Sequence, residues 1–563
     1  MSDQMRNERQ EILSFNKIIR FIDYLIDEDQ VIEFLNKSKT EEKIFKFLQY
    51  YNEDSQNDEI PSKKLCNKFE VNEKLKAIIQ EISLNLKMSK KKSYELLELY
   101  IIDNPKNAND LIRLINLNRI NSNTDDLLNQ QFLFYNENII DFYYSERKCF
   151  LGIISKLLIA AYSNFSNNQI LKNYFDSAIT NKNFLNKMWE QFISYEENPI
   201  RNIQIIHQKN NHISLDRLNE QIFWEQKIIL ECMNIICNND EFCNLDIFNK
   251  LIDYFYKTKF NCYAYKYNNG QYDNIVKELV DRSVAFTILN FQPEKLRLCY
   301  ENQKIDNNLN AFNINIDKLL QFYDDVIGIN SIYPIQCTIE AVIKIMEKLN
   351  DISYNDKIRK FYEKINDNNN NNEISFIFFK DMINSYSIPS LKEGGNYFEI
   401  SCNFMIKSWI NLIMAALYNY NINSYPPSLI ELMCKVLNSP ICREQFFEDD
   451  EKLNTAIYKL FNSFKNNKNY SGNFINMCFA LSNPKIGDEN SKTLFNMLIE
   501  KEDDREESFF DNIFDIWKNL NNTLNDTIND ISFTRTNFNY DNEENNDIFH
   551  LFISKYRICK IIY

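Results

Sequence analysis

The sequence predicts an all-α protein built as an irregular α-solenoid, in which antiparallel helix pairs stack as in HEAT and armadillo repeats. Three observations predict it. Only 7 Gly and 10 Pro occur in 563 residues, far below the roughly 7% and 5% of ordinary chains. Apolar residues recur at helical spacing, and the breaks between them are short, polar and rich in Asn. Sandwiches, barrels and doubly wound sheets need many glycine-bearing turns, so this composition argues against them.

The length indicates an extended array or several domains, because a single core stops growing at roughly 250 to 300 residues. Hydrophobic residues make up 44% of the chain, which excludes global disorder. We expect residues 1–510 to form the solenoid and residues 511–563, which are rich in Asn and Asp, to form a loosely ordered polar tail. The chain ends on Ile561, Ile562 and Tyr563 without a polar capping helix, so we also expect a truncated gene product.

The first helical signal is an apolar stripe on one face. It contains Leu75, Ile78, Ile79, Ile82 and Leu86, which follow the i, i+3, i+4, i+7, i+11 pattern.

The next segment, Lys87–Lys92, is basic and lies between helix-forming sequences. We interpret it as a solvated helix end. A weak localisation signal or a membrane-surface patch is the alternative.

The most apolar stretch is Cys149–Tyr162. Ser155 and Lys156 interrupt it, and it is shorter than the roughly 18 apolar residues that a membrane span requires. It is therefore predicted to be a helix buried in the protein core.

Two further stripes predict an αα-hairpin. Ile229, Cys232, Met233 and Ile236 share one helical face, and Phe248, Leu251, Ile252 and Phe255 repeat the spacing after the polar break at residues 238–241.

Proline and glycine mark the remaining boundaries. Pro427-Ser428 and Ser439-Pro440 predict helix starts, with Ser available as an N-cap. Gly328, the pair Gly394-Gly395 and the Asn run 368–372 are expected in loops. No fixed repeat period is present, so the predicted solenoid is irregular.

The overall charge bears on partners. The net charge is −15 and no basic stripe is visible, so direct nucleic-acid binding is not expected.

Residues 1–12 are polar and of mixed charge, unlike a secretory signal. The thirteen cysteines are scattered, and several lie among apolar residues, as Cys149 and Cys478 do. Such cysteines are typical of buried thiols in a reducing compartment, so a cytosolic or nuclear location is expected.

Histidines and cysteines do not predict a metal site. The three histidines are His207, His212 and His550, and the first two lie five apart in a polar stretch, where we interpret them as loop residues. The spacing of Cys232, Cys237 and Cys243 matches no zinc signature.

Catalytic motifs are also missing from the sequence. Gly394-Gly395 is followed by Asn396-Tyr397, without the Gly-Lys-Ser/Thr of a P-loop, and no Gly-x-Ser-x-Gly occurs. Acidic pairs such as Asp324-Asp325 and Asp449-Asp450 are typical of solvated faces in a chain with 79 acidic residues. We therefore predict no enzyme and assign no catalytic, cofactor-binding or metal-binding residue.

Several colinear segments resemble the N-terminal region of the large inner-ring scaffold nucleoporins, the nucleoporin one-eighty-eight family. The most specific is Asp141–Phe150 (Asp-Phe-Tyr-Tyr-Ser-Glu-Arg-Lys-Cys-Phe), which is similar to a tyrosine-rich family helix with a Glu-Arg step before an apolar helix. The others are Leu75–Ile101, Phe223–Glu231, Asp246–Lys257, Val280–Phe286, Pro334–Ile345 and Leu432–Phe447.

Six residues distinguish these segments from ordinary amphipathic helices, and we assign them an architectural role, with rings filling space between helices and Glu and Arg bridging neighbouring turns. They are Tyr143, Tyr144, Glu146, Arg147, Trp224 and Glu225. Family members are several times longer, and their β-rich insertion and C-terminal solenoid have no counterpart here.

The resemblance implies a structural component of the nuclear pore inner ring, at the nuclear envelope, that supports transport of protein and mRNA. It also implies linker and channel nucleoporins as partners, with transport factors as further contacts and no cofactor. The alternatives are the sibling family of slightly larger inner-ring solenoids and a soluble karyopherin-like transport adaptor. An enzyme with a helical accessory domain is a more distant alternative.

Overall fold

The computed structural model describes part of the chain between residues 60 and 481. The described ranges are 60–61, 71–86, 89–104, 125–162, 172–173, 175–176, 179–180, 184–197, 215–258, 273–313, 316–326, 333–350, 371–386, 396–419, 425–439, 442–443 and 471–481. Over these ranges 88% of the residues are helical and none is in a strand, so the predicted all-α class is confirmed.

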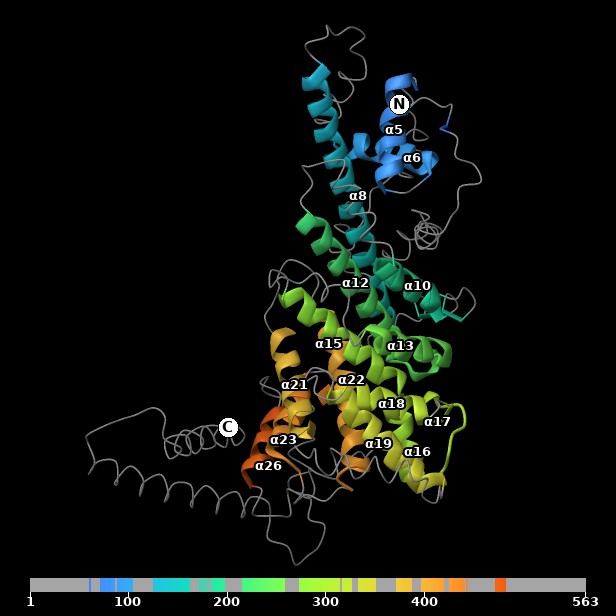
Figure 1. Cartoon of the computed structure of the whole chain (residues 1–563). Helices are drawn as coiled ribbons and strands as arrows, with labels where there is room; N and C mark the ends of the chain where they lie inside the picture. Colours follow the sequence, from blue (N-terminus) through green and yellow to red (C-terminus); the bar gives the residue numbers. More distant parts are fainter. Residues whose placement is uncertain are drawn as a thin grey trace, which may run out of the picture. The chain divides into compact units, whose positions relative to one another are not determined.

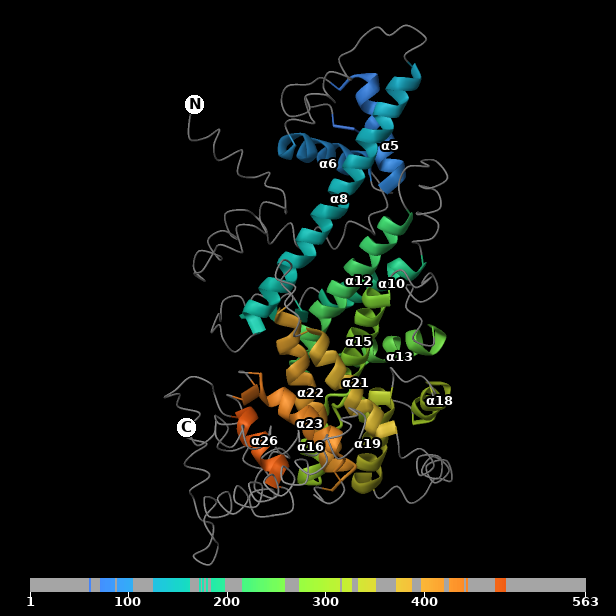
Figure 2. The ribbon, with the colours of Figure 1, turned by 90° about the vertical axis from the view of Figure 1, so that its left-hand side faces the viewer.

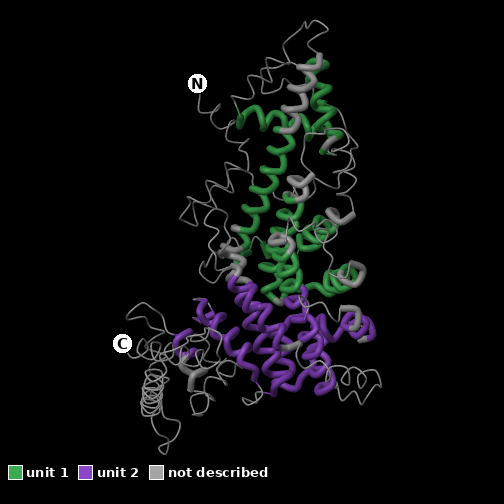
Figure 3. Tube along the Cα trace, turned by 60° about the vertical axis from the view of Figure 1, so that its left-hand side comes forward, with its two compact units in different colours: residues 1–286 green, residues 287–563 purple. Residues whose placement is uncertain are grey.

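The chain divides into two compact units, residues 1–286 and 287–563, with the boundary inside helix α15 (Figure 3). In the first unit the described elements are α5 (Glu73–Leu86), α6 (Lys90–Asp103), α8 (Asp125–Tyr162), α10 (Phe184–Glu197), α12 (Leu215–Cys237), the 3-10 turn η1 (Asp240–Phe242), α13 (Leu245–Thr258) and α15 (Asp273–Asn290) (Figure 1).

The second unit is also helical throughout its described part. Its elements are α16 (Pro293–Asn302), α17 (Asn310–Asn313), α18 (Ile316–Val326), α19 (Tyr333–Asn350), α21 (Asn371–Tyr386), α22 (Asn396–Ala416), α23 (Pro427–Leu437) and α26 (Ser471–Leu481).

Helices α5, α6 and α8 pack around one apolar core in the first unit. The predicted α5 stripe is confirmed, because Leu75, Ile78, Ile79 and Ile82 are all buried there. The stripe meets residues from the other two helices, Tyr94, Leu97, Tyr100, Ile101, Ile139 and Phe142.

Helix α6 begins within the basic run Lys87–Lys92, which we interpreted from the sequence as a solvated helix end. Ser89 is its N-cap, and the Ser89 hydroxyl accepts a hydrogen bond from the Lys92 backbone N–H at 3.3 Å. This bond satisfies one of the orphan donors of the first turn. Lys91 is exposed, as expected of a solvated end, whereas Lys87 lies outside the described residues.

Helix α8 is one continuous helix of 38 residues, which joins the tyrosine-rich segment to the apolar segment without a break (Figure 2). Its apolar end is buried as predicted: Ile153, Ile154, Leu157 and Leu158 have exposed fractions of 2% or less. The backbone of Lys156 is described, but its side chain lies outside the described part.

The two helices of the predicted hairpin are present as α12 and α13. Residues 238–244, which include η1, join them. Ile229, Cys232, Met233 and Ile236 are buried on α12, as Phe248, Leu251 and Ile252 are on α13. The main partners of α12 are α8 and α10, however, so packing between helices distant in sequence dominates over the hairpin contact.

Helix α22 is central to the packing of the second unit, where it contacts α16, α19, α21 and α23. Trp409 on this helix is fully buried, and its ring centroid lies 4.7 Å from that of Phe379 and 5.8 Å from that of Phe376, both on α21. The Trp409 indole N–H donates to the Thr338 hydroxyl at 2.8 Å. This bond satisfies the polar edge of a ring that otherwise supplies apolar contact area.

Helix starts agree with the sequence only in part. α23 begins at Pro427 as predicted, but Pro426 is its N-cap and makes no side-chain capping bond. Ser428 is buried inside the first turn, so its predicted N-cap role is wrong, because proline's fixed φ angle supports this start in place of a side-chain cap. Asn371 and Asn372 form the first turn of α21 and not a loop.

Gly328, Gly394, Gly395 and the tail at 511–563 all lie outside the described residues.

Candidate functional site

The most distinctive polar structure of the first unit is a buried ion pair between α8 and α12. Arg147 and Glu225 each have side chains only 1% exposed, and they lie 78 residues apart in the sequence. The Arg147 Nε donates to both Glu225 carboxylate oxygens at 3.0 Å, and Nη2 donates to Oε2 at 2.8 Å. The guanidinium therefore meets the carboxylate through more than one bond, the geometry that makes an Arg–carboxylate pair strong.

Tyr143 completes the coordination of the guanidinium. Arg147 Nη1 donates to the Tyr143 hydroxyl at 3.2 Å, and the Arg147 Cζ lies 5.5 Å from the centroid of the Tyr143 ring. Tyr143 and Arg147 are one turn apart on α8, so the helix itself places the hydroxyl beside the guanidinium.

Aromatic groups surround this pair. The Tyr143 and Tyr144 rings meet edge to face at 5.4 Å, and the Lys148 ammonium lies 4.3 Å from the centroid of the Trp224 ring. Burial is the main cause that raises the pKa of the Tyr144 hydroxyl above its usual range, followed by the charges of Tyr143 and Glu225. Tyr144 is therefore a neutral phenol at physiological pH.

Five of the six residues singled out from the sequence, all but Glu146, take part in these contacts at the junction of α8 and α12, but with a different pairing. The sequence predicted bridges between neighbouring turns, whereas Arg147 reaches across to Glu225 on another helix. The reason is burial: inside a core an ion must have a full partner, and the partner that faces Arg147 comes from α12. Glu146 is also buried, with an exposed fraction of 4%.

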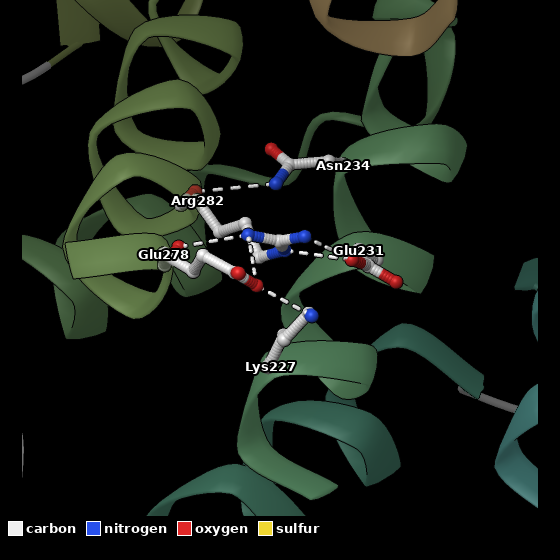
Figure 4. A network of polar contacts seen from close by, with 5 residues as sticks. All are labelled: Lys227, Glu231, Asn234, Glu278 and Arg282. Atoms are coloured by element: carbon white, nitrogen blue, oxygen red, sulfur yellow. Dashed lines mark hydrogen bonds and ion pairs between the residues drawn. The ribbon is translucent and has the colours of Figure 1, made fainter. Parts of the chain in front are cut away.

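A second polar network joins α12 to α15, and the sequence did not predict it (Figure 4). Arg282 is 3% exposed and forms an ion pair with Glu231, to which its Nε donates at 2.7 Å. Its Nη1 lies 3.5 Å from the Glu278 carboxylate. Glu278 also forms an ion pair with Lys227, at 2.5 Å.

Asn234 closes the network by donating its side-chain amide to the Arg282 carbonyl at 3.1 Å. One signal could have revealed it. Asp281 and Arg282 are charged residues inside the segment Val280–Phe286, which is otherwise mostly apolar, and charged groups in such a position are almost always paired.

The cysteines of α12 have the properties of core residues. Burial is the main cause that raises the pKa of the Cys232 thiol well above its usual range, and a hydrogen bond with Ser155 on α8 acts in the opposite direction. The Cys243 thiol donates to the Cys237 carbonyl at 3.4 Å. A buried thiol with a raised pKa, such as that of Cys232, is a poor nucleophile and a poor metal ligand.

The other candidate ligands fall outside the described part, namely His207, His212, His550 and the pair Gly394-Gly395. Among the described residues, no group of three or more His, Cys, Asp or Glu side chains is placed to hold a metal ion. No helix within the described ranges combines the length and apolarity needed to cross a bilayer.

The chemistry that these two networks offer is attachment between helices. Each joins a buried arginine on one helix to a carboxylate on a helix 50 or more residues away, and α12 takes part in both. Buried charges tolerate little misalignment, so such pairs favour one register of the helices over others.

No family model matches the chain, and no curated protein matches it either.

Proposed function

We propose that this protein is a structural scaffold component of the nuclear pore inner ring, folded as an irregular α-solenoid. One observation carries the proposal. The two most specific segments of the resemblance, Asp141–Phe150 and Phe223–Glu231, meet in the structure through the ion pair between Arg147 and Glu225. Motif residues that serve to join two helices are what a scaffold needs, since its function is to hold a shape.

The physical character of the chain supports the same proposal. A stacked helical array presents long surfaces for other proteins without any catalytic pocket. The net charge of −15 favours protein partners over direct contact with nucleic acid. The proposed partners are linker and channel nucleoporins, with transport factors as further contacts, and the proposed location is the nuclear envelope.

Affinity purification of the endogenous gene product tests the proposal. Recovery of other inner-ring nucleoporins supports the scaffold function. Recovery of cargo and a small GTPase without pore scaffold proteins would instead favour a karyopherin-like adaptor, which shares the helical fold and the acidity. Purified protein that hydrolyses nucleotide would contradict the non-enzymatic assignment.

A pair of variants links location to the folded first unit. Arg147→Glu places two carboxylates together in the core and should abolish staining of the nuclear rim by a fluorescently tagged copy. Lys250→Gln removes only an exposed ion pair with Asp246, whose side chains are 49% and 60% exposed, and should leave the staining unchanged. Equal rim staining by both variants would show that the α8–α12 junction is not needed for recruitment.

The solenoid arrangement has its own test in solution scattering. A compact chain of this length has a radius of gyration of roughly 24 Å. A stacked array should give a clearly larger value and an asymmetric distance distribution, whereas a value near that of a compact globule would rule the array out.

A further inference from the structure

A pocket open to solvent, with a mixed polar and apolar lining, lies in the second unit, where α16, α19 and α22 pack together. Its volume is about 360 Å³, within the range of small-molecule sites. The lining residues are Tyr300, Lys344, Glu347, Lys348, Ala416 and Asn419.

A hydrogen bond between side chains joins α16 to the turn that follows α22. The Tyr300 hydroxyl donates to the Asn419 Oδ1 at 2.9 Å, and Tyr300 is only 9% exposed. Asn419 has a φ of 49°, the left-handed region that Asn tolerates better than most residues. Because Oδ1 is occupied by Tyr300, the amide N–H groups of Asn419 remain as donors for a ligand.

The wall formed by α19 carries two cations. Lys344 and Lys348 are one turn apart, so they occupy the same face of the helix. The Lys348 ammonium lies 3.9 Å from the centroid of the Tyr300 ring, a cation–π contact that favours its position beside the pocket although Lys348 is exposed.

Neither ammonium forms an ion pair with a carboxylate in the described part of the chain, although Glu340 exerts a longer-range attraction on Lys344. By comparison, Lys227, Lys250 and Lys380 contact carboxylates at 2.5, 2.6 and 2.7 Å. Both ammonium groups can therefore contact an anion in the pocket.

The negative C-terminal ends of three helices disfavour an anion in this pocket, but less strongly than the two lysines favour it. The cavity lies near the C-terminal ends of α16, α19 and α22, each equivalent to about half a negative charge that water and salt screen. The two ammonium groups carry full charges and reach the cavity itself. Contact with a doubly charged anion therefore outweighs the opposing dipoles, since charge-assisted hydrogen bonds form at close range.

We propose that this cavity binds a small organic phosphate monoester. Lys344, Lys348 and the Asn419 amide contact the phosphate oxygens, and the Glu347 carboxylate accepts a hydroxyl of the organic part. The volume and the mixed lining favour an ester over inorganic phosphate, which would leave most of the cavity unfilled and place Glu347 beside an anion.

Calorimetric titration of the full chain tests this inference, with glycerol 3-phosphate as the probe, and with glycerol and inorganic phosphate for comparison. We expect saturable binding of glycerol 3-phosphate, weaker binding of inorganic phosphate and none of glycerol. The double variant Lys344→Gln, Lys348→Gln should bind glycerol 3-phosphate at least about tenfold more weakly. Lys250→Gln, which removes a lysine from the other unit, should bind it as the wild type does.

Several outcomes would overturn the inference. They are no saturable binding of glycerol 3-phosphate up to about 10 mM, equal binding by the double lysine variant, and equal binding of glycerol. Glu347→Gln should weaken the ester and leave inorganic phosphate unchanged. If inorganic phosphate binds as tightly as the ester, the assignment to an organic ligand is wrong. The comparison of ligands on the wild-type chain decides the matter even if a variant misfolds.

Discussion

At the scale of single residues, the buried charges are the most informative feature of this protein. Arg147, Glu225 and Arg282 are almost completely removed from solvent, and each is paired. A buried ion pair is weak evidence for stability, because the cost of desolvation offsets the attraction, but breaking one leaves an uncompensated charge. The consequence is an asymmetry that mutagenesis can measure.

We predict that Glu225→Ala lowers the free energy of unfolding by about 3 to 5 kcal/mol, because Arg147 is left without its counter-charge. Replacing both residues, with Arg147→Met and Glu225→Leu, should recover most of that loss. Urea denaturation followed by circular dichroism measures both effects. The exposed pair of Lys250 and Asp246 is the control, and Lys250→Ala should cost less than about 1 kcal/mol. Equal losses for the single and double core variants would contradict this view of the pair.

A second prediction concerns Glu340 in the second unit. Burial is the main cause that raises the pKa of this carboxyl to about 7, against the opposing hydrogen bond that the Tyr323 hydroxyl donates at 2.8 Å. The folded protein therefore holds this proton more tightly than the unfolded chain does. The group's contribution to stability is fully present below about pH 4.5 and is lost as pH rises toward about 7, by roughly 3 kcal/mol in total.

Glu340→Gln should remove that dependence and raise stability at pH 8, since the amide oxygen can still accept from Tyr323. Denaturation midpoints of wild type and variant at pH 5 and pH 8 provide the measurement. Glu373→Gln removes an exposed carboxylate from α21 and is the matched control. It should change the denaturation midpoint by the same amount at pH 5 as at pH 8. If the difference between wild type and Glu340→Gln does not change with pH, the carboxyl is ionised throughout and the prediction fails.

At the scale of elements, the apolar end of α8 is enclosed by the first unit. Leu157→Ala or Leu158→Ala should each lower the free energy of unfolding by about 2 to 5 kcal/mol, through lost burial and the cavity left behind. Ser145→Ala, at an exposed position of the same helix, should change it by less than about 0.5 kcal/mol. Similar melting temperatures for the leucine and serine variants would contradict the burial of this segment.

The helices themselves were predictable, because amphipathic spacing is a local property of the sequence. The stripe at Leu75–Ile82 and the buried segment at Ile153–Leu158 both appear as predicted. Contacts between helices were not predictable, since nothing local specifies that Arg147 faces Glu225 or that Arg282 faces Glu231. The start of α23 shows the same limit on a smaller scale: either Ser428 or the prolines could have supported it, and the prolines do.

At the scale of the whole molecule, we expect far-ultraviolet circular dichroism of the full chain to show at least two-thirds helix, twice the share of an average domain. The described part, at 88% helix, agrees with this expectation, and the spectrum extends the test to the rest of the chain. A spectrum dominated by β structure would contradict it.

The environment of Trp409 has an optical consequence. The four tryptophans are Trp189, Trp224, Trp409 and Trp517, and Trp409 is the single described one in the second unit. Its indole is enclosed by Phe376 and Phe379 and bonded to Thr338, so its fluorescence should emit at short wavelength and shift to the red when those helices separate. In a chain carrying Phe at the other three positions, this one fluorophore would report the melting of its own unit.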